Sequence, residues 1–574
     1  MSNAYSRSEH LRSLWPWLPL WAAAALLAIF SHGPMPLYST RTLAVAWEMW
    51  IHHDWLVPHL NGQPYSEKAP LLFWLIHAGW FVFGVNDIWP RVLEVIFGGV
   101  ELVLLSTIAR RMFPARPWVA KAAPWMLMAL SYAFLFGLQV MYDVLLAMWA
   151  LAALLCLTPT LRRDEPRWLL FGLCIGLGLL TKGPVMLLHV LFPWLLGPLW
   201  SDWARSHRAR WYGRGTLAVL LGLVILLAWA LPAGFAGGEA YRHRLFFSQT
   251  AARVIHGVQT AQPLQSHAHP VPWYVLMLPA LLFPLIAWPR AWVALATLRR
   301  PLEPGVRFAL CWVLPTFVVF SLVRGKQLYY LLPELAGTTL LLAGALALLR
   351  ERRTTLSRNA WLGTWPLGVG GIAFGVSLFV LPALVASHRV HSEWLVGAAG
   401  YSRFFGALFI LLGLLLLLRG RGEMRRLAIA GLIGTLGLNT LFTLAMWSRF
   451  DLSPTARLVR AAADAHHALA MEGSYDGEFQ FASRLRQPVA ELHGKPALLA
   501  FAKAHPDGLI IAHPSRLDAA ALRYALLVQP FRSTWIVVWP AATLGDLRSG
   551  ITPPEPPQPT RVYSPDDWRY RTLP

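Results

Sequence analysis

Apolar segments recur along the chain down to about residue 447, each near the roughly 20 residues that cross a bilayer. A soluble domain would instead show shorter apolar runs broken by charge. We predict a polytopic α-helical membrane protein with about thirteen transmembrane helices, the first of them permanent rather than a signal peptide. The predicted starts lie near Trp15, Trp89, Trp118, Val144, Trp168, Val185, Thr216, Trp273, Phe308, Tyr329, Trp365, Phe404 and Leu427.

The stretch from Asp54 to Trp74 interrupts this pattern with a polar centre at residues 65–68. Amphipathic segments lie in and beside it, at Thr42–Trp50 and Pro70–Phe83, and we expect them to be helices lying at the membrane interface. The polar centre is therefore predicted to line a water-facing site at the membrane surface.

The residues after 447 lose the long apolar pattern and are predicted to form a small α/β domain. Helical periodicity covers 455–471, 496–505 and 517–527, and strand-like runs cover 478–482, 509–512 and 534–539. A proline-rich segment follows at 552–559. The predicted organisation is a transmembrane domain at 1–447 and an α/β domain at 448–574.

The distribution of charge predicts how the chain is oriented across the membrane. The net charge is +21, and 56% of the residues are hydrophobic. The basic residues do not collect on one face, so we expect no nucleic-acid partner. They lie in alternate short loops, around residues 110–121, 162–163, 205–214, 299–300, 350–353 and 419–426. Because basic loops favour the cytoplasm, thirteen spans put the N-terminus there and the C-terminal domain on the external face.

The external loops are poor in Lys and Arg, so topology does not account for the bases that they contain. The ones that stand out are Arg41, Lys68, Lys182, Arg324 and Lys326. We identified no comparable group of acids on that side. A phosphate or pyrophosphate ligand is therefore predicted, and a lipid-linked phosphate fits better than a free nucleotide because these loops adjoin lipid.

For Glu67, Asp143 and Lys182, a role in the site and a purely structural role both stay open. Glu67 accepts a proton, binds a metal or neutralises Lys68, or else it forms an interfacial ion pair without further function. Asp143 opens the fourth span, where it serves the chemistry or only caps the helix. Lys182 lies in a tight turn, Thr181–Pro184, where it either helps to bind an anion or snorkels to the interface.

Metal ligands are the least defined part of the predicted site. His267 and His269 lie in the longest external loop, and with Glu67 they would make a metal site if the fold brought them together. The alternative is that they are surface histidines. The three cysteines fall inside apolar spans, so neither a disulfide nor a thiolate metal site is expected.

At these residues the chain resembles a known family, the bacterial aminoarabinose transferases and related protein-mannosyltransferase-like enzymes of the glycosyltransferase-C superfamily. The resemblance covers essentially the whole membrane part. It rests on Trp47-Glu48-Met49, Asp54-Trp55-Leu56-Val57-Pro58, Leu60-Asn61-Gly62, Tyr65-Ser66-Glu67-Lys68-Ala69-Pro70, Phe73-Trp74, Thr181-Lys182-Gly183-Pro184, and Gly325-Lys326 through Tyr330-Leu331-Leu332-Pro333.

The resemblance implies transfer of a sugar, 4-amino-4-deoxy-L-arabinose or a hexose, from a polyprenyl-phosphate donor such as undecaprenyl phosphate. The implied acceptor is a periplasmic lipid or glycan such as lipid A, at the bacterial inner membrane. Arg41 and Lys68 match residues that hold the donor phosphate. Glu67 and His267 match positions proposed to bind zinc or a similar divalent metal, and Asp143 matches an acidic position near the donor. Asp143 is our candidate catalytic residue, Lys182, Arg324 and Lys326 are further candidates for the phosphate, and Tyr330 is a further site candidate.

One position departs from the family pattern, which carries an Asp-Glu pair shortly before the matching arginine. This chain has Tyr38-Ser39 there. General-base catalysis needs a group within hydrogen-bond reach of an acceptor hydroxyl. Either Asp143 takes that role, or the acceptor is already nucleophilic, as a phosphate is, or the protein is a catalytically silent relative that binds or presents lipid-linked sugars. A transporter is less favoured, because we identified no repeated half and no charged residues well inside the spans.

Overall fold

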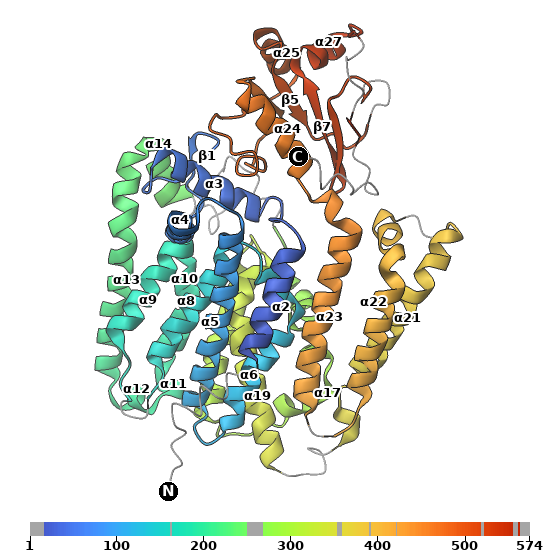
Figure 1. Ribbon diagram of the computed structural model, residues 1–574. Helices are drawn as coiled ribbons and strands as arrows, with labels where there is room; N and C mark the ends of the chain where they lie inside the picture. Colours follow the sequence, from blue (N-terminus) through green and yellow to red (C-terminus); the bar gives the residue numbers. More distant parts are fainter. Residues whose placement is uncertain are drawn as a thin grey trace. The chain divides into compact units, whose positions relative to one another are not determined.

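All thirteen predicted spans coincide with helices, which confirms the polytopic helical fold (Figure 1). Within the residues that the structure describes, seven helices are long and apolar enough to cross a membrane, and the total of thirteen spans stays a prediction. The helices are α2 (Leu18–Ser31), α5 (Ile88–Met112), α6 (Pro117–Ala129), α8 (Tyr142–Leu157), α9 (Trp168–Lys182), α10 (Val185–Leu195), α13 (Arg208–Ala236), α16 (Trp273–Leu282), α18 (Pro304–Leu322), α19 (Leu332–Glu351), α21 (Trp365–Ala386), α22 (Glu393–Leu417) and α23 (Glu423–Met446).

The computed structural model describes residues 17–160, 164–248, 268–352, 359–389, 392–420, 422–517, 522–554 and 561–562. Contacts divide the chain into two units. The first comprises residues 1–31, 66–79 and 88–441, and the second comprises 32–65, 80–87 and 442–574. The second unit thus joins part of the predicted first external loop to the C-terminal residues. Independent folding of 448–574 stays a prediction.

Glycines permit close backbone contact between two helices of the first unit. A Cβ on Gly375 of α21 would lie 2.6 Å from the carbonyl oxygen of Gly406, and one on Gly413 of α22 would lie 2.6 Å from that of Gly368. The two backbones therefore approach more closely than any side chain at these positions would permit. Figure 1 shows α21 and α22 as a side-by-side pair.

The two segments that were predicted to be amphipathic are helical. They form α3 (Ser39–His52) and α4 (Leu71–Phe83). A short hairpin of β1 (His59–Leu60) and β2 (Gln63–Pro64) follows α3. The Gly62 N–H at its turn donates to Glu48 Oε2 on α3 at 3.0 Å. Location of α3 and α4 at the membrane interface stays a prediction.

The second unit contains a six-stranded mixed sheet in the order β4-β3-β5-β7-β6-β8. Its strands are β3 (Leu469–Glu472), β4 (Ala490–Leu492), β5 (Leu509–Ala512), β6 (Leu527–Phe531), β7 (Thr534–Pro540) and β8 (Arg561–Val562). Alternate residues serve opposite faces. Ile511 and Val538 join a core with α24 (Ser453–Asp464), whereas Ile510 and Val537 join a core with α25 (Lys495–Ala504) and α27 (Ala541–Ser549). The small α/β domain is therefore confirmed.

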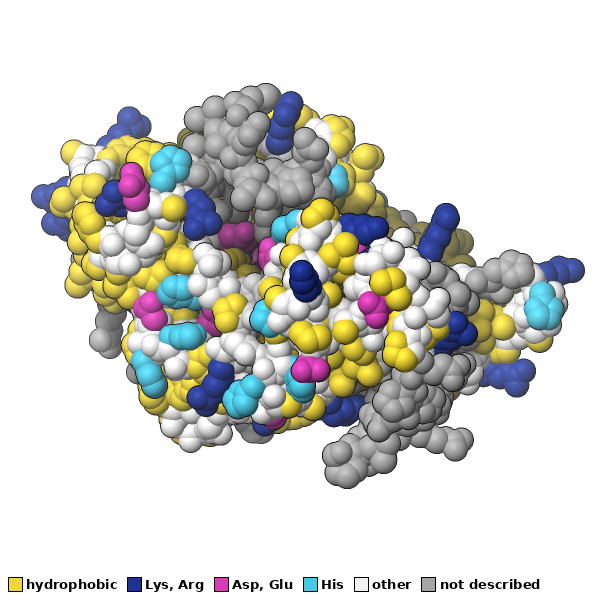
Figure 2. Space-filling model, turned by 90° about the horizontal axis from the view of Figure 1, so that it is seen from above, with side chains coloured by type: hydrophobic (Ala, Val, Ile, Leu, Met, Phe, Trp, Pro, Cys, Tyr) yellow, Lys and Arg dark blue, Asp and Glu magenta, His cyan; other side chains and the backbone are white. Residues whose placement is uncertain are grey.

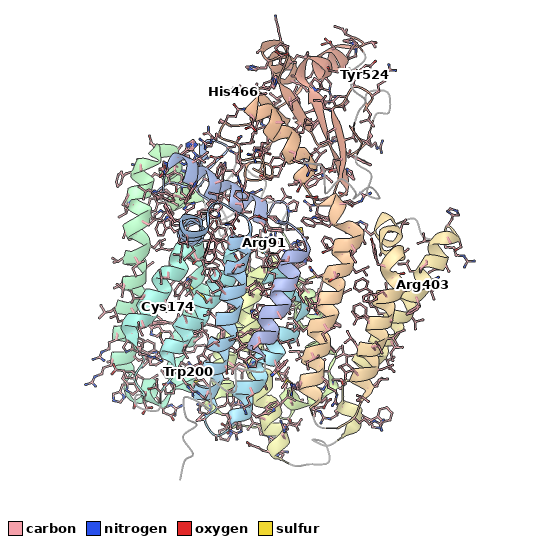
Figure 3. All side chains as sticks on the ribbon, viewed as in Figure 1. Arg91, Cys174, Trp200, Arg403, His466 and Tyr524 are labelled. Carbon is pink, nitrogen blue, oxygen red and sulfur yellow. The ribbon has the colours of Figure 1, made fainter. Side chains whose placement is uncertain are left out.

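Several predicted elements of this domain need correction. The helix predicted at 455–471 ends at Asp464, because His466, labelled in Figure 3, takes a left-handed backbone with φ 60°, and β3 then begins. Residues 478–482 form turns instead of a strand, and their Phe479 N–H donates to the Tyr475 hydroxyl at 3.2 Å. The helix predicted at 517–527 lies partly outside the described residues, and its last residue belongs to β6.

Candidate functional site

The predicted turn at Thr181–Pro184 places Lys182 against Asp143. Lys182 is the last residue of α9, which stops there because Gly183 adopts φ +68° and Pro184 follows. Asp143 lies in the first turn of the neighbouring helix α8. The Lys182 Nζ donates to Asp143 Oδ1, and the two side chains are only 7% and 6% exposed. Both helix ends favour this arrangement, because a cation suits a C-terminus and an anion an N-terminus.

Tyrosine rings lie near Lys182 and near the neighbouring base Lys68. The Lys182 Nζ lies 4.4 Å from the ring centroid of Tyr330 and 5.3 Å from that of Tyr329. The Lys68 Nζ lies 5.7 Å from the ring centroid of Tyr142, the residue before Asp143. These distances allow cation–π attraction. The structure thus brings four predicted residues, Lys68, Asp143, Lys182 and Tyr330, to the start of α8.

Charged residues inside α5 correct the expectation that the spans contain none. Arg91, labelled in Figure 3, donates to the Ile29 carbonyl oxygen on α2. Glu94 is fully buried, and its Oε1 accepts the Met141 N–H at 3.2 Å. Met141 is the N-cap residue of α8, so Glu94 fixes the helix end that carries Asp143. The sequence held this signal, because an acid inside an apolar span is by default a functional candidate.

A second buried pair lies at the start of α19, close in sequence to Tyr330. The His189 Nδ1 on α10 lies 2.8 Å from Glu334 Oε1, and the side chains are 1% and 4% exposed. Glu334 stands in the first turn of α19, four residues after Tyr330. The pair therefore anchors the start of α19, directly after the short helical turn that carries Tyr330. Sequence reasoning did not select either residue.

Lys326 and Arg324 are held in a loop contact. The Lys326 side chain is buried, and its Nζ donates to the His269 carbonyl oxygen at 2.8 Å. The His269 N–H in turn donates to the Arg324 carbonyl oxygen at 3.2 Å, while the Arg324 side chain is exposed. An ammonium has three donors, so one such bond leaves capacity for a phosphate. Binding of phosphate by these two residues stays a prediction.

The described residues do not by themselves form a metal site. Among them, no group of three His, Cys, Asp or Glu side chains is placed to hold an ion. Glu67 is half-buried, and His267 lies outside the described residues. His269 is stacked on Trp273, with ring centroids 4.1 Å apart.

Arg41 lies on α3 in the second unit and pairs with an acid that the sequence did not reveal. Its Nη2 lies 2.6 Å from Asp476 Oδ1, with side chains 23% and 38% exposed. Arg41 and Lys182 thus both have carboxylate partners, which corrects the expectation that no comparable group of acids accompanies the predicted phosphate-binding bases. Figure 2 shows basic, acidic and histidine side chains interspersed on one face of the molecule.

The loop that carries Asp476 is held by contacts with Glu478, which in turn lies near His513. Its N–H donates to Glu478 Oε2 at 3.1 Å, and the His513 Nε2 lies 3.7 Å from Glu478 Oε1. Burial raises the pKa of Glu478 to about 7, with the Asp476 charge adding to the shift and Arg41 opposing it. Burial also lowers the pKa of His513 to about 4, so its imidazole is neutral at pH 7.

The pKa of Glu478 predicts a pH-dependent stability. An unfolded chain loses this proton near pH 4.5, whereas the folded protein keeps it to about pH 7, so the stabilisation declines as the pH rises across this window. Glu478→Gln cannot ionise, yet it retains an oxygen for the Asp476 N–H. Its free energy of unfolding is expected to exceed that of the wild type by about 3 kcal/mol at pH 8, with little difference near pH 4.5. Denaturant titration followed by tryptophan fluorescence measures this, and equal differences at both pH values would contradict the assignment.

The sequence of this chain is similar to those of known proteins. A family model described as dolichyl-phosphate-mannose-protein mannosyltransferase matches residues 67–229. An undecaprenyl phosphate-alpha-4-amino-4-deoxy-L-arabinose arabinosyl transferase of Pseudomonas paraeruginosa is 31% identical over 374 residues, which are 62% of this chain and 62% of that protein. A second such transferase, from Pseudomonas fluorescens, is 30% identical over 401 residues, which are 66% of this chain and 68% of that protein.

The fold is also similar to a solved structure. The crystal structure of ArnT from Cupriavidus metallidurans bound to undecaprenyl phosphate matches with a TM-score of 0.67 at 18% identity. The match covers 91% of this chain and 97% of that one. The likeness therefore extends over the C-terminal α/β domain as well as the membrane helices.

Proposed function

The chain belongs to the family of bacterial undecaprenyl phosphate–aminoarabinose transferases of the glycosyltransferase-C superfamily, and on this basis we propose that it transfers a sugar from a polyprenyl phosphate to a membrane acceptor. The observation that carries the proposal is 30% identity over two thirds of both chains. The proposed sugar is 4-amino-4-deoxy-L-arabinose or a hexose, and the proposed acceptor is lipid A. The protein would lie in the inner membrane, with its N-terminus in the cytoplasm and its α/β domain in the periplasm.

In this reaction an acceptor oxygen bonds to the anomeric carbon of the sugar. The bond from that carbon to the donor phosphate oxygen breaks, and its electron pair leaves with the polyprenyl phosphate. Negative charge therefore grows on the departing phosphate. We assign stabilisation of this charge to the ammonium groups of Lys68 and Lys182. Preorganised positive charge at a leaving group usually makes the largest contribution to catalysis in such sites.

Asp143 suits orientation better than proton removal. Its carboxylate is buried and engaged by Lys182, so it holds that ammonium in place. An acceptor hydroxyl would need a base within hydrogen-bond reach, whereas a phosphate oxygen is nucleophilic near neutral pH without one. We therefore propose a phosphate group of the acceptor as the nucleophile.

A transfer assay in proteoliposomes tests the proposal. The purified protein is given labelled undecaprenyl-phosphate sugar and lipid A, with dephosphorylated lipid A as the matched control acceptor. We expect label on the phosphorylated lipid alone, in an acid-labile glycosyl phosphate. Label on both acceptors would contradict a phosphate nucleophile, and binding of donor with no transfer to any acceptor would identify a silent relative.

We separately propose a divalent ion, zinc or similar, bound through Glu67 and His267. The family resemblance motivates it, the described residues supply too few ligands alone, and no step above depends on it. Elemental analysis is expected to find about one zinc per chain, lost in a Glu67→Gln variant. A protein purified without chelators that contains no divalent metal, and whose transfer rate is unchanged by dialysis against EDTA, would contradict this.

A further inference from the structure

The loop that carries Asp476 packs directly on α3, the helix of Arg41. Gly477 has φ +77°, and a Cβ added there would lie 2.6 Å from Leu60 Cδ1 and 3.0 Å from Ala44 Cβ. Only a glycine allows so close an approach in this backbone conformation. The loop backbone is thus seated on α3 one residue away from Asp476.

Hydrogen bonds fasten the chain beyond this loop to α3 and the hairpin. The Trp47 Nε1–H donates to the Leu485 carbonyl oxygen at 2.7 Å. Asn61 makes two bonds with Val489, donating from Nδ2 to its carbonyl oxygen at 2.9 Å and accepting its N–H at 2.7 Å. Trp47 and Asn61 belong to the motifs that carry the family resemblance, and here their bonds hold the segment that follows the Asp476 loop against α3 and the hairpin.

We propose that Asp476 is a positioning residue for Arg41, holding its guanidinium in a fixed orientation before the donor phosphate arrives. This rests on the proposed function and on the family resemblance, by which Arg41 matches a residue that holds the donor phosphate. A guanidinium has five N–H donors, so a bond to Asp476 leaves others for a phosphate. Fixing a long side chain in advance removes an ordering cost from ligand binding.

A carboxylate beside Arg41 also has an opposing effect, because it lowers the positive charge that attracts a phosphate. Both members of the pair are partly exposed, 23% and 38%, so solvent screens that Coulombic effect. The ordering effect should therefore exceed it. Removal of the Asp476 charge is expected to weaken binding of the lipid phosphate rather than strengthen it.

A double-mutant cycle tests this with the full-length protein in lipid nanodiscs titrated with undecaprenyl phosphate. Asp476→Asn is expected to raise Kd about 5- to 10-fold in the wild-type background, and less than about twofold in an Arg41→Gln background. Asp476→Glu, which keeps the charge, should restore most of the affinity. Asp464→Asn is the matched control, because Asp464 forms an exposed pair with Arg460 in the same unit.

An unchanged or tighter Kd in Asp476→Asn would overturn the inference, as would an equal fold-change in both Arg41 backgrounds. Melting temperatures of the variants show whether weaker binding reflects misfolding, and a deficit that Asp476→Glu does not rescue would also overturn it. The proposed chemistry is judged separately by sugar transfer. A wild type that binds undecaprenyl phosphate without transferring sugar would remove the enzymatic proposal alone, whereas a wild type that fails to bind would remove both.

Discussion

Asp143→Ala is expected to destabilise the protein by about 3 to 5 kcal/mol, because it leaves the Lys182 ammonium buried without its carboxylate. The two side chains are 6% and 7% exposed, so bulk water solvates the remaining ammonium poorly. The nearby Tyr330 ring, 4.4 Å from Nζ, offers only a weaker attraction. Thermal unfolding of the purified variant measures the loss, and sugar transfer should fall to the level of a protein-free blank.

A double variant separates the contribution of the ion pair to stability from its contribution to sugar transfer. Asp143→Leu with Lys182→Met replaces the pair by apolar side chains, which for buried ion pairs is often neutral or stabilising. We expect this double variant to recover the wild-type melting temperature without recovering transfer. Recovery of both would show that the pair only holds α8 against α9. A melting temperature as low as that of Asp143→Ala would contradict the electrostatic explanation of the instability.

Lys68→Ala is expected to lower the rate of sugar transfer about 10²- to 10³-fold, the usual effect of removing one preorganised donor from a developing charge. Lys68 lies 5.7 Å from the Tyr142 ring, beside the buried pair, and is half-exposed, so its loss should leave folding intact. Initial rates at several donor concentrations measure the effect. It should appear in kcat as well as in KM, because charge on the phosphate grows as its bond breaks.

Two variants control this result. Lys68→Arg keeps the charge but not the geometry, so we expect partial activity between those of the wild type and Lys68→Ala. Lys503→Ala removes an exposed lysine of α25 and should not change the rate. An effect of Lys68→Ala confined to KM would indicate that Lys68 binds the donor equally before and during the reaction.

The parts of the fold that depend on local pattern were predictable. Apolar runs of membrane-spanning length placed the helices, and Gly183 with Pro184 marked the end of α9. The strand predicted at 478–482 was wrong. The prediction followed from the alternation of Phe479 and Phe481 with polar residues, which is typical of a strand. In the structure both rings are buried in a turn-rich loop, and Phe481 packs edge-on to Trp47. Tertiary packing there outweighs local preference.

Pairings between distant residues were not predictable. The topology rule applies to each base singly, so no pattern in the sequence joins Lys182 to Asp143 or Arg41 to Asp476. Asp476 lies in a stretch with no pattern of its own, and its role follows only from the loop seated on α3. Glu94 differs from these residues, because its place inside the apolar run of α5 is visible in the sequence and marks it as a functional candidate.

The most direct test is transfer of labelled sugar from undecaprenyl phosphate to lipid A by the purified protein in proteoliposomes, with wild type and Lys68→Ala in parallel. We expect labelled lipid A to accumulate with the wild type, and a signal close to the protein-free blank with the variant. Equal rates for the two proteins, or no labelled lipid A from a wild type that binds the donor, would contradict a transferase acting through Lys68.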